Sequence, residues 1–282
     1  MKILLVLVLF SFSLGIRAQE NGAKELYDLS EIFLANKNFP RWWKSVRQAA
    51  DMGSLAGLTR MGDGYMQGLP VIGVEKNLET AIGYYTRAAD MGYKDAIYML
   101  GNAHREKGTY NQALAYYRKL SDGGNHDATQ LLGEAYLTGE GIEANHAKAL
   151  ELFTKGMNAG HSTCTYDIGY MYRNGSGVAR DVTKAMEFYQ KAGEQGNGLA
   201  YRNLGEMYSA GEGVEINAEE AFSWFALGSE AGDAQSAVNC LTLISDEKVL
   251  GNKETILKYA YRSKELGHPS ADELVTWAEG LE

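Results

Sequence analysis

Residues 161–196 read HSTCTYDIGYMYRNGSGVARDVTKAMEFYQKAGEQG, and this stretch contains each part of a pattern that recurs along the chain. Ile168 and Tyr172 are four residues apart, so they lie on the same face of a helix. Gly175 and Gly177 follow, on either side of Ser176. Glycine tolerates the left-handed backbone conformation that commonly ends a helix. The stretch therefore predicts two helices joined by a short loop, with Gly196 ending the second helix.

The closing glycine recurs at a nearly constant distance along the 282-residue sequence. Successive copies are 32 to 39 residues apart, at Gly53, Gly92, Gly124, Gly160, Gly196, Gly232 and Gly267. The motif aliphatic-Gly-x-x-Tyr recurs in step with them, at 61–65, 132–136, 168–172 and 204–208, and His104 replaces the tyrosine at 100–104. Repetition at this period is typical of solenoids built from helical repeats.

Two further regularities define the helices of each repeat, which we call helix A and helix B in chain order. Helix A contains the aliphatic-Gly-x-x-Tyr motif. Its glycine costs about 1 kcal/mol relative to alanine, so the recurrence of this glycine predicts close contact with a neighbouring helix. Helix B carries a bulky pair, such as Phe188–Tyr189, and begins after a residue that suits an N-cap. The predicted N-caps are Asn77, Asn145, Asp181 and Asn217.

The combined pattern resembles the Sel1-like repeat family, a relative of the tetratricopeptide repeat. The resemblance implies an all-α fold, an α-solenoid wound as a right-handed superhelix, with about seven helix-loop-helix repeats and a C-terminal capping helix. It also implies a concave groove that is lined by the A helices. We expect a degenerate first repeat, five regular repeats, a degenerate last repeat and the capping helix at 22–53, 54–232, 233–267 and 268–282.

The first residues have the pattern of a secretory signal peptide, cleaved after residue 18. Lys2 precedes the apolar stretch Ile3–Ile16, and Ala18 supplies a small residue for cleavage. This stretch is shorter than the roughly 20 apolar residues that a membrane span needs, and no later apolar run in the sequence could span a bilayer. We therefore expect an exported protein, periplasmic or secreted, without a membrane span.

Composition and charge exclude several classes of protein. The chain is 45% hydrophobic with only 3 prolines, which is unlike a disordered or collagen-like protein. Its formal net charge is −9, and an acidic protein repels the phosphates of nucleic acid. We expect no nucleic-acid partner.

The two cysteines and the histidines do not form a recognisable disulfide or metal pattern. Cys164 and Cys240 occupy packed positions of A helices two repeats apart, beyond the about 4.4–6.8 Å between Cα atoms that a disulfide needs. We predict two buried free thiols. His104 takes the place of a packed tyrosine and is predicted to be a core residue. Zinc-binding motifs are absent from the sequence, so we predict no metal site and no cofactor.

Enzymatic motifs are weak in this sequence. The glycine loops are not preceded by a strand or followed by the Gly-Lys-Ser/Thr of a phosphate-binding loop. Ser245 and Lys248 fit the Ser-x-x-Lys motif of serine-active penicillin-binding enzymes, but the other elements of that motif set are missing. These observations favour a protein without catalytic residues.

Candidate binding residues flank the packed positions of the A helices. Tyrosine and arginine, which recur among them, are typical hot-spot residues of protein interfaces. The candidates for the concave groove are Tyr98, Asn102, Arg105, Gln130, Glu134, Tyr166, Tyr170, Arg173, Asn174, Arg202 and Glu206.

The family resemblance implies an interaction scaffold, adaptor or regulator that binds a protein or peptide partner through this groove. We expect a monomeric protein that is not an enzyme. Two alternatives stay open. The first is a peptidoglycan- or glycan-binding or β-lactamase-like envelope enzyme, with Tyr166, Tyr170 and Glu206 contacting sugar. The second is a general folding helper that binds unfolded chains.

Overall fold

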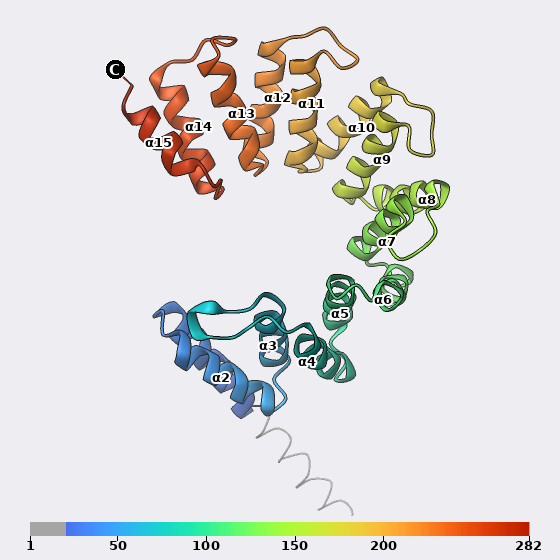
Figure 1. Ribbon diagram of the computed structural model, residues 1–282, viewed down its shortest axis with the longest axis vertical. Helices are drawn as coiled ribbons and strands as arrows, with labels where there is room; N and C mark the ends of the chain where they lie inside the picture. The colour runs from blue at the N-terminus through green and yellow to red at the C-terminus, as the bar shows by residue number, and fades with distance from the viewer. Residues whose placement is uncertain (1–20, 282) are drawn as a thin grey trace, which may run out of the picture. The chain divides into compact units, whose positions relative to one another are not determined.

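A computed structural model describes residues 21–281, and Figure 1 shows their arrangement. The predicted signal peptide at 1–18 lies outside the described residues. The chain divides into two compact units, of which the first ends at Gly123 and the second begins at Gly124. We call them unit 1 and unit 2, and each is described by itself.

Unit 1 is a series of antiparallel helical hairpins. Residues 21–35 are helical and precede the labelled helices. Consecutive helices pack against one another, and a three-residue 3-10 helix lies between α3 and α4. The elements are α2 (Phe39–Asp51), α3 (Leu55–Gln67), η1 (Pro70–Ile72), α4 (Leu78–Asp90), α5 (Lys94–Glu106) and α6 (Tyr110–Asp122).

Unit 2 continues the same alternation of A and B helices, and among residues 21–281 no strand is formed. The all-α solenoid fold that the sequence predicts is therefore confirmed. The elements of unit 2 are α7 (His126–Thr138), α8 (His146–Asn158), α9 (Ser162–Asn174), α10 (Val182–Glu194), α11 (Gly198–Ala210), α12 (Ala218–Glu230), α13 (Ala234–Ser245), α14 (Lys253–Glu265) and α15 (Ala271–Glu279). The predicted boundaries of the terminal repeats stay predictions.

The four predicted N-caps are confirmed. They precede the B helices α4, α8, α10 and α12. Asp181 Oδ1 accepts a hydrogen bond from the Lys184 backbone N–H at 3.0 Å, and Asn77, Asn145 and Asn217 cap their helices in the same way. At the preceding loop, Gly175 ends α9 in the left-handed conformation with φ of 71°. Local sequence thus sets both ends of the loop.

The glycine of helix A lies against the second aromatic residue of the bulky pair in helix B. A Cβ atom on Gly169 would lie 2.9 Å from the Tyr189 ring, and one on Gly205 would lie 2.5 Å from the Phe225 ring. The same contact joins Gly62 to Tyr85, Gly101 to Tyr117 and Gly133 to Phe153. The predicted close contact is confirmed, and it sets the spacing between the two helices of each repeat.

In three repeats, the first residue of the bulky pair stacks on the aromatic residue that ends the helix A motif. The rings of Tyr172 and Phe188 are 5.5 Å apart and nearly parallel, at 7°. His104 stacks on Tyr116 at 5.6 Å, and its Nδ1 lies 2.8 Å from Thr109 Oγ1. Burial lowers the pKa of His104, and nearby Lys107 lowers it further. His104 is therefore a satisfied core residue, as predicted.

Both cysteines are free and buried in the helix packing. Burial raises the pKa of each thiol to about 12, so both are protonated near neutral pH. The prediction of two buried free thiols is confirmed in the structure. Within residues 21–281, none of the helices combines the length and apolar character that crossing a membrane requires.

Candidate functional site: the A-helix face

The candidate binding residues divide between the two units. Three of them lie on α5 in unit 1, and the other eight lie on α7, α9 and α11 in unit 2. We use the name A-face for the following side chains of unit 2, which include two that the sequence did not single out: Gln130, Glu134, Tyr166, Asp167, Tyr170, Arg173, Arg202, Asn203 and Glu206.

The three candidates in unit 1 are half-buried, and two of them, Tyr98 and Asn102, contact Tyr117 of α6. Tyr117 Oη donates a hydrogen bond to Asn102 Oδ1 at 2.7 Å, and the Tyr98 ring lies 6.4 Å from the Tyr117 ring. One repeat earlier, Tyr85 Oη donates to Asp63 Oδ1 at 2.7 Å. In both repeats, the side chain that follows the helix A glycine accepts a hydrogen bond from the second tyrosine of the bulky pair in helix B. Arg105 is half-buried on the same helix.

In unit 2, a hydrogen bond joins the A helices α7 and α9. Gln130 Nε2 donates to Asp167 Oδ2 at 2.8 Å. Burial raises the pKa of Asp167, the Gln130 hydrogen bond lowers it and the nearby carboxylate of Glu134 raises it, which together give a pKa of about 7. Asp167 therefore titrates at a higher pH than an ordinary aspartate, and its hydrogen bond with Gln130 joins two repeats.

A larger group of contacts joins α9 to α11. Arg173 Nη1 donates to Asn203 Oδ1 at 2.8 Å, and the same guanidinium donates two bonds to Glu212 Oε2, at 3.0 and 2.6 Å. Arg180 donates to the other oxygen of Glu212 at 3.1 Å. The Arg173 bonds in particular lower the pKa of Glu212. Asn203 Nδ2 donates to Tyr166 Oη at 3.4 Å. Arg173 and Tyr166 therefore hold neighbouring repeats together.

The remaining predicted residues differ in how accessible they are. Tyr170 is 43% exposed and is the most exposed aromatic residue of the A-face. Asn174 is exposed and donates a hydrogen bond from Nδ2 to the Tyr170 carbonyl oxygen at 2.9 Å. Arg202 forms an ion pair with Asp233 at 3.2 Å, and Glu206 is half-buried. Tyr170 is thus the A-face side chain best placed to meet a partner.

Sequence reasoning missed Asp63, Asp167, Asn203 and Glu212. A signal for two of them was present, because Asp167 and Asn203 each precede the helix A glycine by two residues, 36 residues apart. A polar residue at the same position of consecutive repeats can form a row across the A helices. Glu212 had no such signal, since it lies in a loop and reaches back to the preceding repeat.

The Ser-x-x-Lys segment has its side chains engaged elsewhere. Ser245 Oγ donates to the Thr242 carbonyl oxygen at 3.0 Å, and Lys248 pairs with Asp246 at 3.1 Å. No group of histidine, cysteine, aspartate and glutamate side chains among residues 21–281 could hold a metal ion.

Comparison with known proteins shows which repeat family these helical hairpins match. A model of the Sel1 repeat matches five consecutive segments, 55–93, 94–125, 126–161, 162–197 and 198–233. The chain belongs to the Sel1 repeat family. The matched segments include all the α5, α7, α9 and α11 residues described above. None of the curated proteins matches the sequence.

Two solved structures are similar to this Sel1 repeat chain. The first is c5321, a protective antigen of uropathogenic Escherichia coli, which is 26% identical with a TM-score of 0.53 over 92% of this chain. The chain spans only 57% of that antigen's length. The second is a Sel1 repeat protein from Oxalobacter formigenes, 21% identical with a TM-score of 0.61, where the match covers 85% of this chain and 99% of that one. The second likeness supports the fold alone.

Proposed function

We propose that this chain is an exported, non-enzymatic adaptor that binds a segment of a partner protein on the A-face of unit 2. The observation that carries the proposal is the set of hydrogen bonds between consecutive A helices, from Gln130 to Asp167 and from Arg173 to Asn203. These bonds hold the polar side chains in place before a partner arrives. A surface that is already ordered loses less conformational entropy on binding.

The exposed chemistry of the A-face favours a peptide segment. Tyr170 offers an aromatic ring and a hydroxyl, and the half-buried Glu134 and Glu206 occupy the same position in the repeats before and after it. Tyrosine gives a large contact area at a low entropy cost, and carboxylates accept hydrogen bonds from backbone N–H groups and cationic side chains. The Sel1 repeat fold is consistent with a role in protein–protein interaction.

Affinity capture from the source cell's envelope and secreted fractions tests this proposal when wild type is compared with Tyr170→Ala. The matched control is Leu227→Ala on the B helix α12, because Leu227 is 40% exposed and Tyr170 is 43% exposed. We expect specific partners to be lost from the Tyr170 variant and retained by the Leu227 variant. Equal loss in both variants would contradict a role for the A-face. Saturable binding of muropeptides that Tyr170→Ala abolishes would instead assign the surface to a glycan.

Export rests on the N-terminal sequence and is tested separately. The chain should be found outside the cytoplasm, with a mass that corresponds to cleavage after Ala18. A full-length chain retained in the cytoplasm would contradict export but would leave the A-face proposal standing.

A further inference from the structure

The last repeat of unit 2 departs from the regular pattern between α13 and α14. Leu241 takes the place of the helix A glycine. In α12 the aromatic residue Phe225 lies seven residues before the closing glycine, and in α14 that position is Ala260. Leu241 and Ala260 are buried in the same apolar cluster. The small and the large residue have thus exchanged helices, and α13 contributes a leucine where the A helices of the matched repeats have a glycine.

A cavity of about 310 Å³ lies between α13 and α15, at the C-terminal end of unit 2 (Figure 1). We call it the C-terminal cavity, and its lining residues are Val238, Leu241, Thr242 and Ser245 of α13 and Leu274 and Trp277 of α15. None of the six is charged, and Thr242, Ser245 and Trp277 are exposed, so the cavity is accessible from solvent. Ligand pockets commonly measure about 300–1,000 Å³, so this one has room for a side chain rather than for a large ligand.

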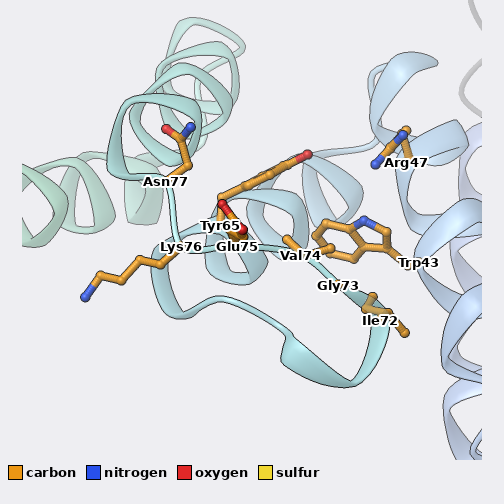
Figure 2. Close-up of a pocket in the computed structure, with 9 residues that line it drawn as sticks. All are labelled: Trp43, Arg47, Tyr65, Ile72, Gly73, Val74, Glu75, Lys76 and Asn77. Carbon is orange, nitrogen blue, oxygen red and sulfur yellow. The ribbon is translucent and has the colours of Figure 1, made fainter.

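The cavity of about 440 Å³ in unit 1 differs in its chemistry. It lies beside the loop between α3 and α4, and Figure 2 shows the charged residues Arg47, Glu75 and Lys76 among those that line it. A charged group loses hydration when a ligand covers it, which costs free energy unless the ligand pairs with it. The uncharged lining of the C-terminal cavity avoids this cost, so it favours an apolar occupant.

The C-terminal cavity continues the row of A helices that carries the A-face. Glu206 in α11 is followed at the same helix position by Thr242 in α13 and by Trp277 in α15, 36 and then 35 residues further on. Tyr170 precedes Glu206 by the same 36 residues. Because α13 packs against α11, the row passes directly from the A-face to the cavity. The polar A-face therefore ends in a largely apolar groove.

An acidic residue next to the cavity favours a cation beside the apolar group. Glu273 is exposed and lies one helical turn before Trp277 on α15. Within residues 21–281 it forms no ion pair or hydrogen bond. Lys264 of the neighbouring helix α14 pairs with Asp272 instead, at 2.8 Å. Glu273 is thus available to a basic residue of a partner.

We propose that the C-terminal cavity receives a large apolar side chain of the partner segment that binds the A-face, with a basic residue of that segment beside Glu273. An aromatic ring of the segment packs against Trp277 and Leu274. The proposal rests on the proposed function, because it extends the A-face to the end of unit 2. It restricts the partner to segments in which a large apolar residue has a basic neighbour.

The test titrates capped peptides into the full mature chain and follows the indole N–H resonance of Trp277 by NMR, assigned by its loss in Trp277→Phe. The probe is Ac-Gly-Phe-Lys-Gly-NH2. We expect a saturable shift of this resonance, with binding at least about fivefold weaker for Ac-Gly-Ala-Lys-Gly-NH2, which lacks the ring, and for Ac-Gly-Phe-Glu-Gly-NH2, which reverses the charge. Equal affinities for the three peptides, or no saturable shift, would overturn the proposal. A shift that depends on protein concentration alone would assign the cavity to a second copy of the chain and would overturn it too.

Two matched variants separate the cavity from general charge effects. Thr242→Arg places a long side chain in the cavity and should weaken binding of the probe at least about fivefold. Thr276→Arg is the control, because both threonines are exposed, both donate a hydrogen bond to the backbone carbonyl four residues earlier, and both changes add the same charge. Equal weakening by the two variants would count against a site at the cavity.

Capture of partners separates this proposal from the proposed function. We expect Thr242→Arg to lose the partners that Tyr170→Ala loses, while Thr276→Arg retains them. Loss in Tyr170→Ala with retention in Thr242→Arg would overturn the role of the cavity and leave the proposed function standing. Retention in Tyr170→Ala would contradict the proposed function, whatever the peptides show.

Discussion

Gly169 illustrates how one residue sets the distance between the two helices of a repeat. The Tyr189 ring occupies the space where a side chain on Gly169 would begin, and the Ala185 carbonyl oxygen lies 3.2 Å from the same point. Glycine is a poor helix former, so its use here reflects packing and not helix propensity. The same contact is present at the equivalent glycine of each of the five matched repeats.

Replacing this glycine should therefore destabilise the protein. We expect Gly169→Ala to lower the free energy of unfolding by about 1–3 kcal/mol through overpacking, partly offset by the better helix propensity of alanine. Gly83→Ala is the control, because Gly83 lies within α4 with no atom within 4 Å of its missing Cβ. It should raise stability by up to about 1 kcal/mol. Urea unfolding measures both, and two variants that change stability alike would refute the packing account.

Asp167 gives a prediction about pH. Its pKa is raised from an ordinary 3.8 to about 7, so the folded chain keeps a proton that the unfolded chain has already lost. The free energy of unfolding should therefore fall as the pH rises from about 4 to about 7. Asp167→Asn removes the ionisable group, so this loss of stability with pH disappears, and the Asn side chain can still accept the Gln130 hydrogen bond. We expect this variant to exceed wild type by about 1–3 kcal/mol at pH 8, with a smaller difference at pH 5.

The difference between the wild-type and Asp167→Asn stability curves is the quantity to measure, because it cancels the titration of groups that do not interact with Asp167. His104 in particular opposes Asp167: its lowered pKa makes stability fall as the pH drops through its titration range. A constant difference between pH 5 and pH 8 would show that Asp167 has an ordinary pKa in solution.

At the scale of the helix, caps account for the boundaries of the B helices. Asn217 Oδ1 accepts hydrogen bonds from the backbone N–H groups of both Glu219 and Glu220, at 3.1 and 3.0 Å. Asn217→Ala should cost about 1 kcal/mol of unfolding free energy. Ser270 precedes α15 without a side-chain cap bond, so Ser270→Ala should cost much less. Thermal unfolding compares them, and equal losses would contradict the capping account.

The helices and their caps could be predicted from the sequence because each depends on residues close together in the chain. Asn145 directly precedes the helix that it caps, and Gly169 is separated from Tyr189 by one loop. The contacts of the A-face could not be predicted in this way. Arg173 meets Glu212 across 39 residues, at a distance that depends on how one repeat stacks on the next.

The loop between α3 and α4 shows a second limit of sequence reasoning. The inserted residues of the loop after α3 were visible as extra length, but η1 and the Leu69–Val74 bridge depend on how the loop folds against α2. The other four regular repeats gave no example of this conformation to compare. An insertion in a repeat therefore predicts where structure departs from the pattern, without predicting its shape.

At the scale of the whole molecule, stability within each unit comes from the stacking of neighbouring helices, since the two cysteines do not pair. A thiol reagent should find no reactive cysteine in the folded chain, because both thiols are buried and have raised pKa values. After unfolding without a reductant it should find two. No thiol in the unfolded, unreduced chain would contradict this account.

Site-specific photocrosslinking tests the central claim, that the A-face of unit 2 binds a partner, most directly. A photoreactive amino acid replaces Tyr170 on the A-face or, in the matched chain, the exposed Glu187 on the B helix α10. Both chains are expressed in the source cell and irradiated there. We predict discrete protein adducts from position 170 and few or none from position 187. Adducts that form equally at both positions, or that form mainly at 187, would contradict the claim.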